Sequence, residues 1–321
     1  MIRFWEDHPE LAGRLEAVRD LILQRAASDD PDVRAAVSQL LDASGKMLRP
    51  AFVLLASEFG SPDPRRILRA AAAIEMLHMA TLVHDDIIDG APLRRGVATL
   101  HTLRGPRIAV LVGDWLFASC FSLVADLGGD SHGGELARLV SRICGSEISQ
   151  STERFSASTS VRRYLRRIAG KTAALFALSF HVGAEQAGCA AAEISVLRRL
   201  GYCLGMGFQI IDDVLDFSSN PAETGKLTGG DLSQGIYTLP VVHALRADPG
   251  ALAGQLERAR RSRRAAARAS RMVAGGEGIR LSRSAAEGYT HRALCALDRL
   301  PPAPAREVLR SVTKRLLQRT W

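Results

Sequence analysis

A helical period of apolar residues continues along almost the whole chain. Apolar side chains recur three and four positions apart, Ala, Leu and Arg abound, and no clean run of alternating β-branched residues occurs. Some segments, for example 173–184, are apolar around most of a helix circumference, which is typical of helices in the middle of a large bundle. The sequence therefore predicts an all-α fold built as one large helical bundle.

Segments rich in Gly, Pro, Asp and Ser separate the expected helices. The helices are expected at 8–27, 31–43, 46–59, 63–89, 106–127, 133–153, 160–182, 190–218, 234–247, 250–274, 280–298 and 303–319. No connecting segment is long enough to separate two domains. We therefore expect a single all-helical domain over residues 1–321.

Cysteine usage and the N-terminus favour the cytoplasm. The five cysteines are an odd number and none forms a CxxC pair, so neither a disulfide framework nor a zinc site is expected. The first ten residues carry acidic side chains where a signal peptide has an apolar run. The longest uncharged apolar stretches, such as 172–184 and 201–211, are too short to span a bilayer. A soluble cytoplasmic protein is expected.

An acidic group ends the apolar segment 74–89. Asp85 and Asp89 lie one helical turn apart on one face, and His78 falls within about 20° of both. Three polar side chains therefore share one stripe of an otherwise apolar helix.

The segment 208–216, FQIIDDVLD, repeats this arrangement. Asp212 and Asp216 are one turn apart, and Gln209 lies on the same side two turns before Asp216. One such motif alone is as compatible with a solvated helix end as with a site. Two of them favour a site, because buried carboxylates that lie close together repel strongly unless a cation neutralises them. All-oxygen ligands favour Mg²⁺, which shares its coordination shell with phosphate oxygens, so two facing clusters would form a Mg²⁺–diphosphate clamp.

Basic residues near these clusters suit an anionic ligand. The formal net charge is +8, and only four of the 42 basic residues are lysines. Lys46, Lys171 and Lys226 each follow a glycine, and a lysine retained in an arginine-rich chain suggests a compact charge for phosphate. Each of them taken alone is more often a surface lysine than a ligand.

The order of motifs resembles the trans-isoprenyl (polyprenyl) diphosphate synthases over nearly the whole chain. The motifs are GKxxRP (45–50), ExxHxxxLxHDDxxDxxxxRRG (75–96), GDxxF (113–117), KT (171–172), FQxxDDxLD (208–216), GK (225–226), GDL (230–232) and TLP (238–240). Segments 74–86 and 164–173 are most similar to the large catalytic subunit of two-component heptaprenyl diphosphate synthases. The resemblance implies an isoprenoid-synthase bundle around a central cavity, and a homodimer or a heterodimer with a small regulatory subunit.

The resemblance also implies a role for each matching residue. Three carboxylates would bind Mg²⁺, with three ions per site when diphosphate is bound: Asp85, Asp89 and Asp212. Three more would support that catalytic site: Asp86, Asp213 and Asp216. The allylic diphosphate would be held by Arg94, Lys171, Thr172, Gln209 and Lys226, with Lys171 also counted as catalytic. Isopentenyl diphosphate would be held by Lys46, Arg49, His78 and Arg95.

Three positions depart from the family pattern. Ser44 replaces the usual glycine before Gly45, and Met47 replaces a basic residue, which is expected to weaken isopentenyl diphosphate binding. The segment 235–240 reads GIYTLP where many relatives have a lysine. The resembling large subunits also lack that lysine, so its absence does not indicate lost activity.

The resemblance implies Mg²⁺-dependent condensation of isopentenyl diphosphate with an allylic diphosphate. The small residues Ala80 and Thr81 favour a long all-trans product, of the kind used for a quinone side chain. Ala80 and Thr81 lie one turn below Asp85, where shorter-chain relatives place an aromatic floor, although both could instead pack against a neighbouring helix. A farnesyl or geranylgeranyl synthase, a terpene cyclase and a non-catalytic partner subunit remain as alternatives. A cyclase would have one DDxxD motif, and a partner subunit typically loses aspartates, whereas this chain keeps all six.

Two further features are not explained by the reaction. His84 is interpreted as a packed, hydrogen-bonded residue rather than a ligand. The segment 256–271 contains seven arginines and is interpreted as a solvated helix face. A peripheral membrane contact for product release, or the docking of a partner, is the alternative. Nothing in the sequence points to nucleic acid as a partner.

Overall fold

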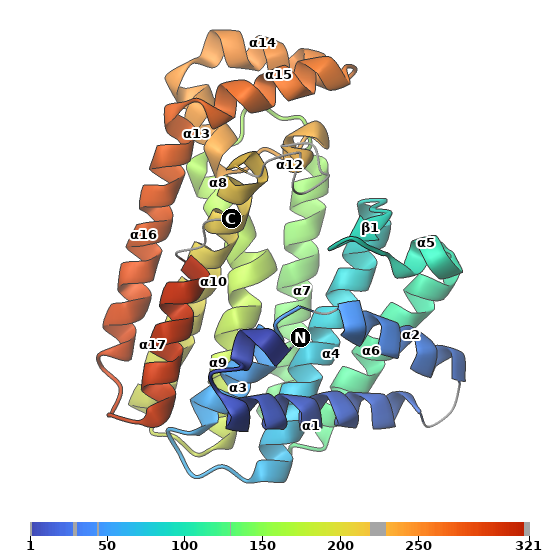
Figure 1. The fold of residues 1–321 in the computed structure, drawn as a ribbon, viewed down its shortest axis with the longest axis vertical. Helices are drawn as coiled ribbons and strands as arrows, with labels where there is room; N and C mark the ends of the chain where they lie inside the picture. The colour runs from blue at the N-terminus through green and yellow to red at the C-terminus, as the bar shows by residue number, and fades with distance from the viewer. Residues whose placement is uncertain (1, 28–30, 44, 129, 219–228, 318–321) are drawn as a thin grey trace. The chain divides into compact units, whose positions relative to one another are not determined.

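The computed structural model of the chain describes residues 2–27, 31–43, 45–128, 130–218 and 229–317. Helices dominate these residues, as predicted (Figure 1). The contacts divide the chain into two compact units, unit 1 with residues 1–137 and 179–195, and unit 2 with residues 138–178 and 196–321. The predicted single domain and the predicted clamp shared by both aspartate clusters stay predictions.

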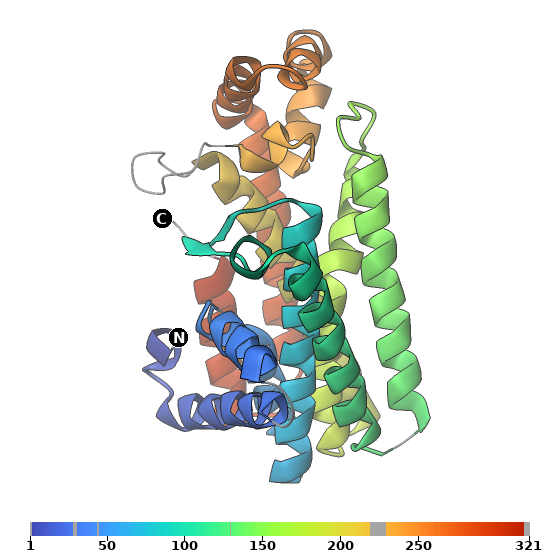
Figure 2. The same ribbon diagram turned by 90° about the vertical axis from the view of Figure 1, so that its right-hand side faces the viewer.

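Unit 1 is built around one long helix, α4. Its elements are η1 (Ile2–Trp5), α1 (Pro9–Ala26), α2 (Pro31–Ala43), α3 (Leu48–Ser57), α4 (Pro64–Ile88), β1 (Leu93–Arg94), β2 (Val97–Ala98), α5 (Leu100–Arg104), α6 (Pro106–Ala125) and the first turns of α7 (Asp130–Thr152). The Asp63 side chain accepts hydrogen bonds from the backbone N–H groups of Arg65 and Arg66 and thereby starts α4. α4 packs against α1, α3 and α6, which buries apolar residues on nearly every side of the helix (Figures 1 and 2). The aspartates at its end are therefore held on a rigid element.

Unit 2 holds most of the remaining helices. They are α8 (Val161–Ile168), the π-helical turn η2 (Ala169–Ala173), α12 (Gly230–Ser233), α13 (Leu239–Ala247), α14 (Pro249–Ala259), α15 (Arg263–Ala274), α16 (Glu277–Leu297) and α17 (Pro304–Leu317). Two more helices, α9 (Ala174–Gln186) and α10 (Ala191–Ser218), are divided between the two units. The unit boundaries fall inside α7, α9 and α10. α13 packs against α16, and α14 and α15 lie side by side as a helical hairpin (Figures 1 and 2).

Three predicted helices differ most from the structure. The predicted helix 250–274 is two helices, because Ser262 leaves the helical conformation and its hydroxyl accepts a hydrogen bond from the N–H of Ala265. The predicted helix 234–247 begins only at Leu239, where Pro240 suits a first turn. The predicted helix 160–182 contains the π-helical turn and continues to Gln186.

Two described helices are long and apolar enough to cross a membrane by length and composition: α4, with 25 residues, and α6, with 20. Neither helix is an uncharged stretch, because both contain charged residues, so neither was predicted from the sequence. A buried core helix passes the same test, and 67% of the apolar window of α4 is buried. Only 33% of the window in α6 is buried, so α6 presents much of its apolar surface to the outside.

Candidate active site

The first aspartate cluster ends α4 and contains two environments. Asp86 is buried, and its Oδ1 accepts a hydrogen bond from Nε of Arg94 at 2.8 Å and forms an ion pair with Nη2 of Arg94 at 2.7 Å. Asp85 and Asp89 are half-buried. The two carboxylates predicted to bind metal are therefore partly open to solvent. Asp86 instead pairs with Arg94, a residue predicted to bind the allylic diphosphate.

A two-residue hairpin after this cluster places Arg95. β1 and β2 pair antiparallel, and the turn residues Arg95 and Gly96 have φ values of 53° and 80°. Two positive φ angles are typical of the type I′ turn, and they are costly for a residue with a side chain. A Cβ atom on Gly45 would lie 1.8 Å from Nη1 of Arg95. The guanidinium therefore occupies space that only a glycine at position 45 leaves open.

Arg49 and His78 are in direct contact within unit 1. Nη1 of Arg49 lies 2.8 Å from Nε2 of His78, and burial together with Arg49, Arg95 and Arg94 holds the pKa of His78 well below its usual value. The imidazole is therefore neutral, and Nε2 accepts from the guanidinium. Lys46 precedes Arg49 by three residues. The backbone of Lys46 is fixed by a hydrogen bond that its carbonyl accepts from the Trp5 indole at 2.7 Å.

Glu75, one turn before His78, was not predicted as a site residue. It is 2% exposed, and one of its carboxylate oxygens has no hydrogen-bond partner among the described residues. Burial raises the pKa of Glu75 to about 7, while the positive charges of Arg49 and Arg95 oppose the rise. The signal in the sequence was an acidic residue in the apolar middle of this helix, away from the aspartates at its end.

The titration of Glu75 predicts a pH-dependent stability. The native carboxyl binds its proton more tightly than the unfolded one, whose pKa is 4.5, so the free energy of unfolding should fall as the pH rises from 4.5 to about 7. A shift of this size corresponds to about 3 kcal/mol. Glu75→Gln should remove that part of the pH dependence in urea unfolding, whereas the exposed Glu287→Gln should keep it. Equal slopes for wild type and Glu75→Gln would contradict the assignment.

The second aspartate cluster contains a buried hydrogen-bond chain within unit 2. Oδ2 of Asp213 accepts from the Tyr164 hydroxyl at 2.6 Å, and Oδ1 accepts from Nε2 of Gln209 at 2.9 Å. Oε1 of Gln209 accepts in turn from the Thr172 hydroxyl at 2.7 Å. Burial raises the pKa of Asp213 to about 7 against the opposing effect of these donors. Two predicted diphosphate ligands, Thr172 and Gln209, are thus joined to a predicted supporting aspartate.

The other two aspartates of this cluster are half-buried. Asp216 accepts hydrogen bonds from the backbone N–H groups of Gly230 at 3.2 Å and Asp231 at 3.3 Å, which caps α12 and accounts for the position of the GDL motif. Asp212 lies one turn earlier on α10. The predicted ligand Lys226 lies outside the described residues, as does Ser44.

Lys171 projects from the π-helical turn η2. Its Nζ lies 2.5 Å from Oε1 of Glu147 on α7, a partner that was not predicted. A Cβ atom on the preceding Gly170 would lie 2.0 Å from Oγ of Ser146, so the turn packs tightly against α7. Single π-helical turns of this kind are frequent at functional sites, and this one sets the direction of Lys171 and Thr172.

Tyr164 was also missed by sequence reasoning, and its contact with Asp213 is testable. Tyr164→Phe leaves a buried carboxylate one donor short and should lower the free energy of unfolding by about 1–3 kcal/mol. Chemical denaturation measures this loss. Tyr202→Phe, which removes a hydroxyl from a side chain 38% exposed, should have little effect. Equal destabilisation by both changes would contradict the importance of the buried bond.

The GDxxF motif forms the surroundings of His84. The imidazole Nε2 lies 3.4 Å from Oδ1 of Asp114, and the ring stacks on Phe117 with centroids 5.5 Å apart. A Cβ atom on Gly113 would lie 2.5 Å from Nε2. His84 is therefore packed against α6, as predicted, and it ties the end of α4 to that helix.

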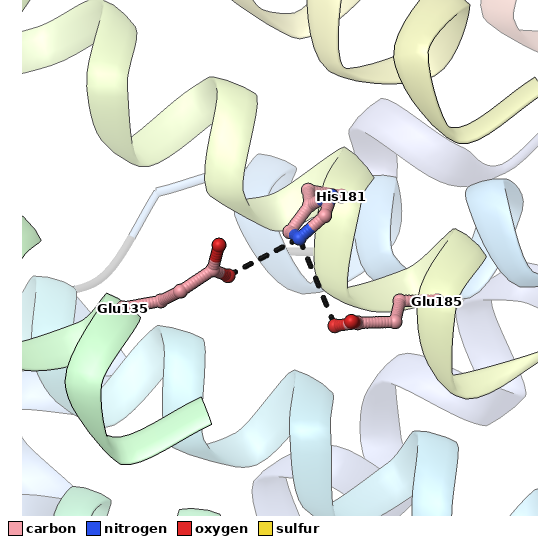
Figure 3. A group of neighbouring side chains, drawn as sticks. All are labelled: Glu135, His181 and Glu185. Carbon is pink, nitrogen blue, oxygen red and sulfur yellow. Dashed lines mark ion pairs between the residues drawn. The ribbon is translucent and has the colours of Figure 1, made fainter. Parts of the chain in front are cut away.

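A second polar cluster lies elsewhere in unit 1. Nε2 of His181 on α9 lies 3.1 Å from Oε2 of Glu135 and 3.7 Å from Oε2 of Glu185 (Figure 3). The three donor atoms lie within 4.8 Å of one another. The imidazole lies at ion-pair distance from both carboxylates, and none of the three residues belongs to a motif described above. We assign this cluster no part in the reaction.

Comparisons with known proteins identify the class of protein. A family model described as polyprenyl synthetase matches residues 30–273, and the chain belongs to this family. The chain is a prenyltransferase with an isoprenoid-synthase fold, as predicted from its motifs.

Individual relatives agree with this assignment. The chain is 38% identical over 307 residues to heptaprenyl diphosphate synthase component 2 of Geobacillus stearothermophilus, covering 94% of each protein. It superimposes on a geranylgeranyl pyrophosphate synthase from Lactobacillus brevis with a TM-score of 0.93, at 33% identity, over 99% of this chain and 100% of the other. A polyprenyl synthase from Caulobacter crescentus in complex with calcium and isoprenyl diphosphate gives a TM-score of 0.90 at 32% identity, over 99% and 96%.

Proposed function

We propose that this enzyme condenses isopentenyl diphosphate with an allylic diphosphate to make a long-chain all-trans polyprenyl diphosphate in the cytoplasm. One observation carries the proposal: each aspartate cluster has a buried middle aspartate bound by protein donors and two half-buried aspartates beside it. The same arrangement therefore occurs at the ends of two helices. The chain is also similar to a heptaprenyl diphosphate synthase component, and both facts favour chain elongation over cyclisation.

Mg²⁺ fits the donor set of these clusters. Asp85, Asp89 and Asp212 offer only carboxylate oxygens, which hard divalent cations prefer. The Caulobacter relative contains calcium, another hard divalent cation, together with isoprenyl diphosphate. When bound, Mg²⁺ would neutralise the charge that develops on the departing diphosphate. We place three such ions at the site, as the resemblance implies.

The protein's own groups bind and orient the two substrates. Lys46, Arg49, His78 and Arg95 hold isopentenyl diphosphate in this proposal. The allylic diphosphate is held by Arg94, Lys171, Thr172, Gln209 and Lys226. Loss of diphosphate leaves an allylic cation, the double bond of isopentenyl diphosphate attacks it, and loss of a proton restores an alkene one unit longer. This reaction needs no protein nucleophile, and apolar walls around the site would exclude water from the cation.

The residues below Asp85 favour a long product. Thr81 is half-buried and its hydroxyl donates to the carbonyl of His78 at 2.7 Å, whereas Ala80 is fully buried. A ring at Ala80 would therefore overpack the core, which typically costs about 1–3 kcal/mol. Thr81 is the better position at which to add a floor without unfolding the protein.

Thr81→Phe should shorten the product without abolishing the first condensation. The ring fills volume that the growing chain needs, while the aspartates lie a turn away and stay intact. Chromatography of labelled products measures the change. Thr81→Val keeps the volume of threonine and should leave the product distribution unchanged, and an unchanged distribution for Thr81→Phe would contradict a tunnel along this face.

A partner polypeptide is also proposed, with α6 as its contact surface. Ile108, Val110, Leu111 and Phe121 on this helix are between 39% and 54% exposed. Such a patch typically marks a protein interface. The Geobacillus relative is named component 2, which favours a small regulatory subunit as the occupant, and a second copy of the chain is the alternative.

Purified protein, Mg²⁺, labelled isopentenyl diphosphate and farnesyl diphosphate test the function directly. Products longer than geranylgeranyl diphosphate support the proposal, and products that stop at or below that length support the shorter-chain alternative. Turnover that appears only when a separate small subunit is added would show that the activity requires a partner polypeptide, which could bind at α6 or at another surface. No turnover under either condition would favour a non-catalytic subunit.

A further inference from the structure

Seven arginines cover the outer side of the α14–α15 hairpin. They are Arg258, Arg260, Arg261, Arg263, Arg264, Arg268 and Arg271, and all seven are exposed. We call them the arginine face. Segment 256–271 contains one acidic residue, Glu257, whose carboxylate lies 3.2 Å from Nη1 of Arg260. The surface therefore carries a strong local excess of positive charge.

These charges are placed where they weaken their own helix. Arg263 and Arg264 occupy the first two positions of α15, whose first turn contains no acidic residue. The N-terminus of a helix carries partial positive charge and favours anions. Arg264 and Arg268 are four residues apart, and Arg268 and Arg271 three apart, which are spacings at which like charges repel. An anionic surface bound to this face would relieve both effects.

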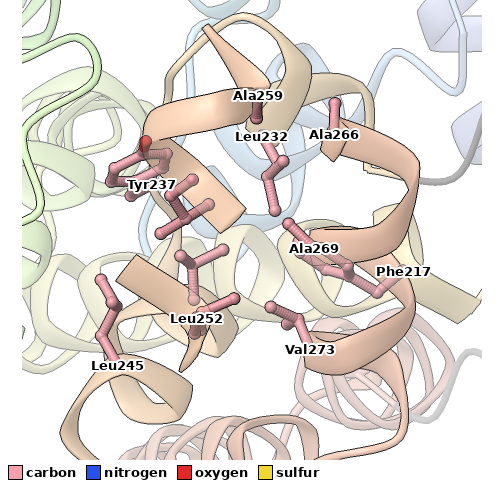
Figure 4. Close-up of a cluster of buried hydrophobic side chains, with 11 residues drawn as sticks. Phe217, Leu232, Tyr237, Leu245, Leu252, Ala259, Ala266, Ala269 and Val273 are labelled. Carbon is pink, nitrogen blue, oxygen red and sulfur yellow. The ribbon is translucent and has the colours of Figure 1, made fainter. Parts of the chain in front are cut away.

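The inner side of the hairpin is anchored in a buried apolar cluster. Leu256, Ala266, Ala269 and Val273 pack there with other apolar residues, including Phe217 (Figure 4). The cluster fixes the hairpin, so the arginines project from a folded support.

This cluster adjoins the second aspartate motif. Phe217 directly follows Asp216, and the Cβ position of Gly229 lies 2.6 Å from Oγ of Ser270 on α15. The arginine face therefore belongs to a hairpin that packs against the end of the helix carrying that motif.

We propose that the arginine face docks the enzyme on an anionic lipid bilayer, with guanidinium groups on headgroup phosphates. The choice of a bilayer rests on the proposed function, because a polyprenyl product has a long hydrocarbon tail that must reach lipid. Guanidinium groups bind phosphate oxygens in a bidentate manner. Segment 256–271 has no aromatic residue on which a nucleobase could stack. None of the described large hydrophobic residues exposed on the chain lies on α14 or α15, so the attraction is electrostatic.

Vesicle sedimentation with the full chain tests this docking. Wild type should bind vesicles that contain phosphatidylglycerol and not vesicles of phosphatidylcholine alone. Raising the salt from about 0.1 M to about 1 M shortens the screening length from about 10 Å to about 3 Å and should abolish binding. Each basic residue near an anionic surface contributes to the free energy of membrane binding. A triple variant, Arg264→Gln with Arg268→Gln and Arg271→Gln, should therefore bind about 100-fold more weakly.

A matched control removes the same charge elsewhere. Arg65, Arg69 and Arg107 are exposed, and the first two are also four residues apart on a helix. Their triple change to glutamine should alter vesicle binding by less than about twofold, because these arginines lie outside the arginine face. Equal losses in both triple variants, or equal binding of wild type to neutral vesicles, would overturn the proposal.

Two further readouts separate this proposal from the reaction. Condensation activity in detergent should be the same for the arginine-face variant and wild type, so loss of prenyl transfer and loss of docking are independent results. Competition with a short RNA duplex at the same salt tests the other anionic partner. The choice of a bilayer would be overturned if RNA displaced the protein from phosphatidylglycerol vesicles when the concentration of RNA phosphate was lower than that of lipid phosphate.

Discussion

Asp85→Ala or Asp212→Ala should each lower kcat/KM for condensation by at least about 10³-fold, because the charge on the departing diphosphate is then poorly neutralised. Both side chains are half-buried, so their removal should leave the fold intact. Incorporation of labelled isopentenyl diphosphate measures activity, and thermal unfolding measures stability.

The matched control for these substitutions is Asp126, an aspartate at the end of a helix that lies in neither aspartate cluster. Asp126 caps the end of α6 and pairs with Arg25 at 2.9 Å, so Asp126→Ala should keep full activity. Asp86→Asn should differ from Asp85→Ala, because it weakens the ion pair of the buried Asp86 with the partly exposed Arg94 and should reduce stability as well as activity. Turnover by Asp85→Ala near the wild-type rate, or by wild type in excess EDTA, would disprove the metal role of the clusters.

Substitutions at the two basic regions should separate the two substrates. Lys46→Ala and His78→Ala should raise the KM for isopentenyl diphosphate by about 10- to 100-fold, the range expected for losing a charged hydrogen bond. His78→Ala acts through Arg49, whose guanidinium loses its acceptor. Lys171→Ala should instead raise the KM for the allylic substrate, since the lysine lies on a separate element, η2.

Initial rates with each substrate varied in turn measure both KM values. Lys314 is exposed and lies in no motif, so Lys314→Ala is the control and should change neither value. If Lys46→Ala and Lys171→Ala raise both KM values to the same extent, the assignment of separate diphosphate pockets is wrong.

Local sequence patterns were sufficient for the fold class, the family and the location of both aspartate clusters. Helical periodicity acts over a few residues, so the turn-by-turn spacing of Asp85 with Asp89 and of Asp212 with Asp216 could be predicted from their numbers alone. Helix boundaries were less certain where capping competes with periodicity, as at Ser262, where one hydroxyl divides a predicted helix into two.

Contacts between residues far apart in the chain could not be predicted in this way. Tyr164 reaches Asp213 across 49 positions, and Arg49 reaches His78 across 29. These contacts decide that Asp213 is a buried, supported carboxylate and that His78 is a neutral acceptor, because burial and neighbouring charges set the protonation of each group. Periodicity shows which face of a helix a side chain occupies, whereas only the packing of other elements against that face determines its partners and its charge.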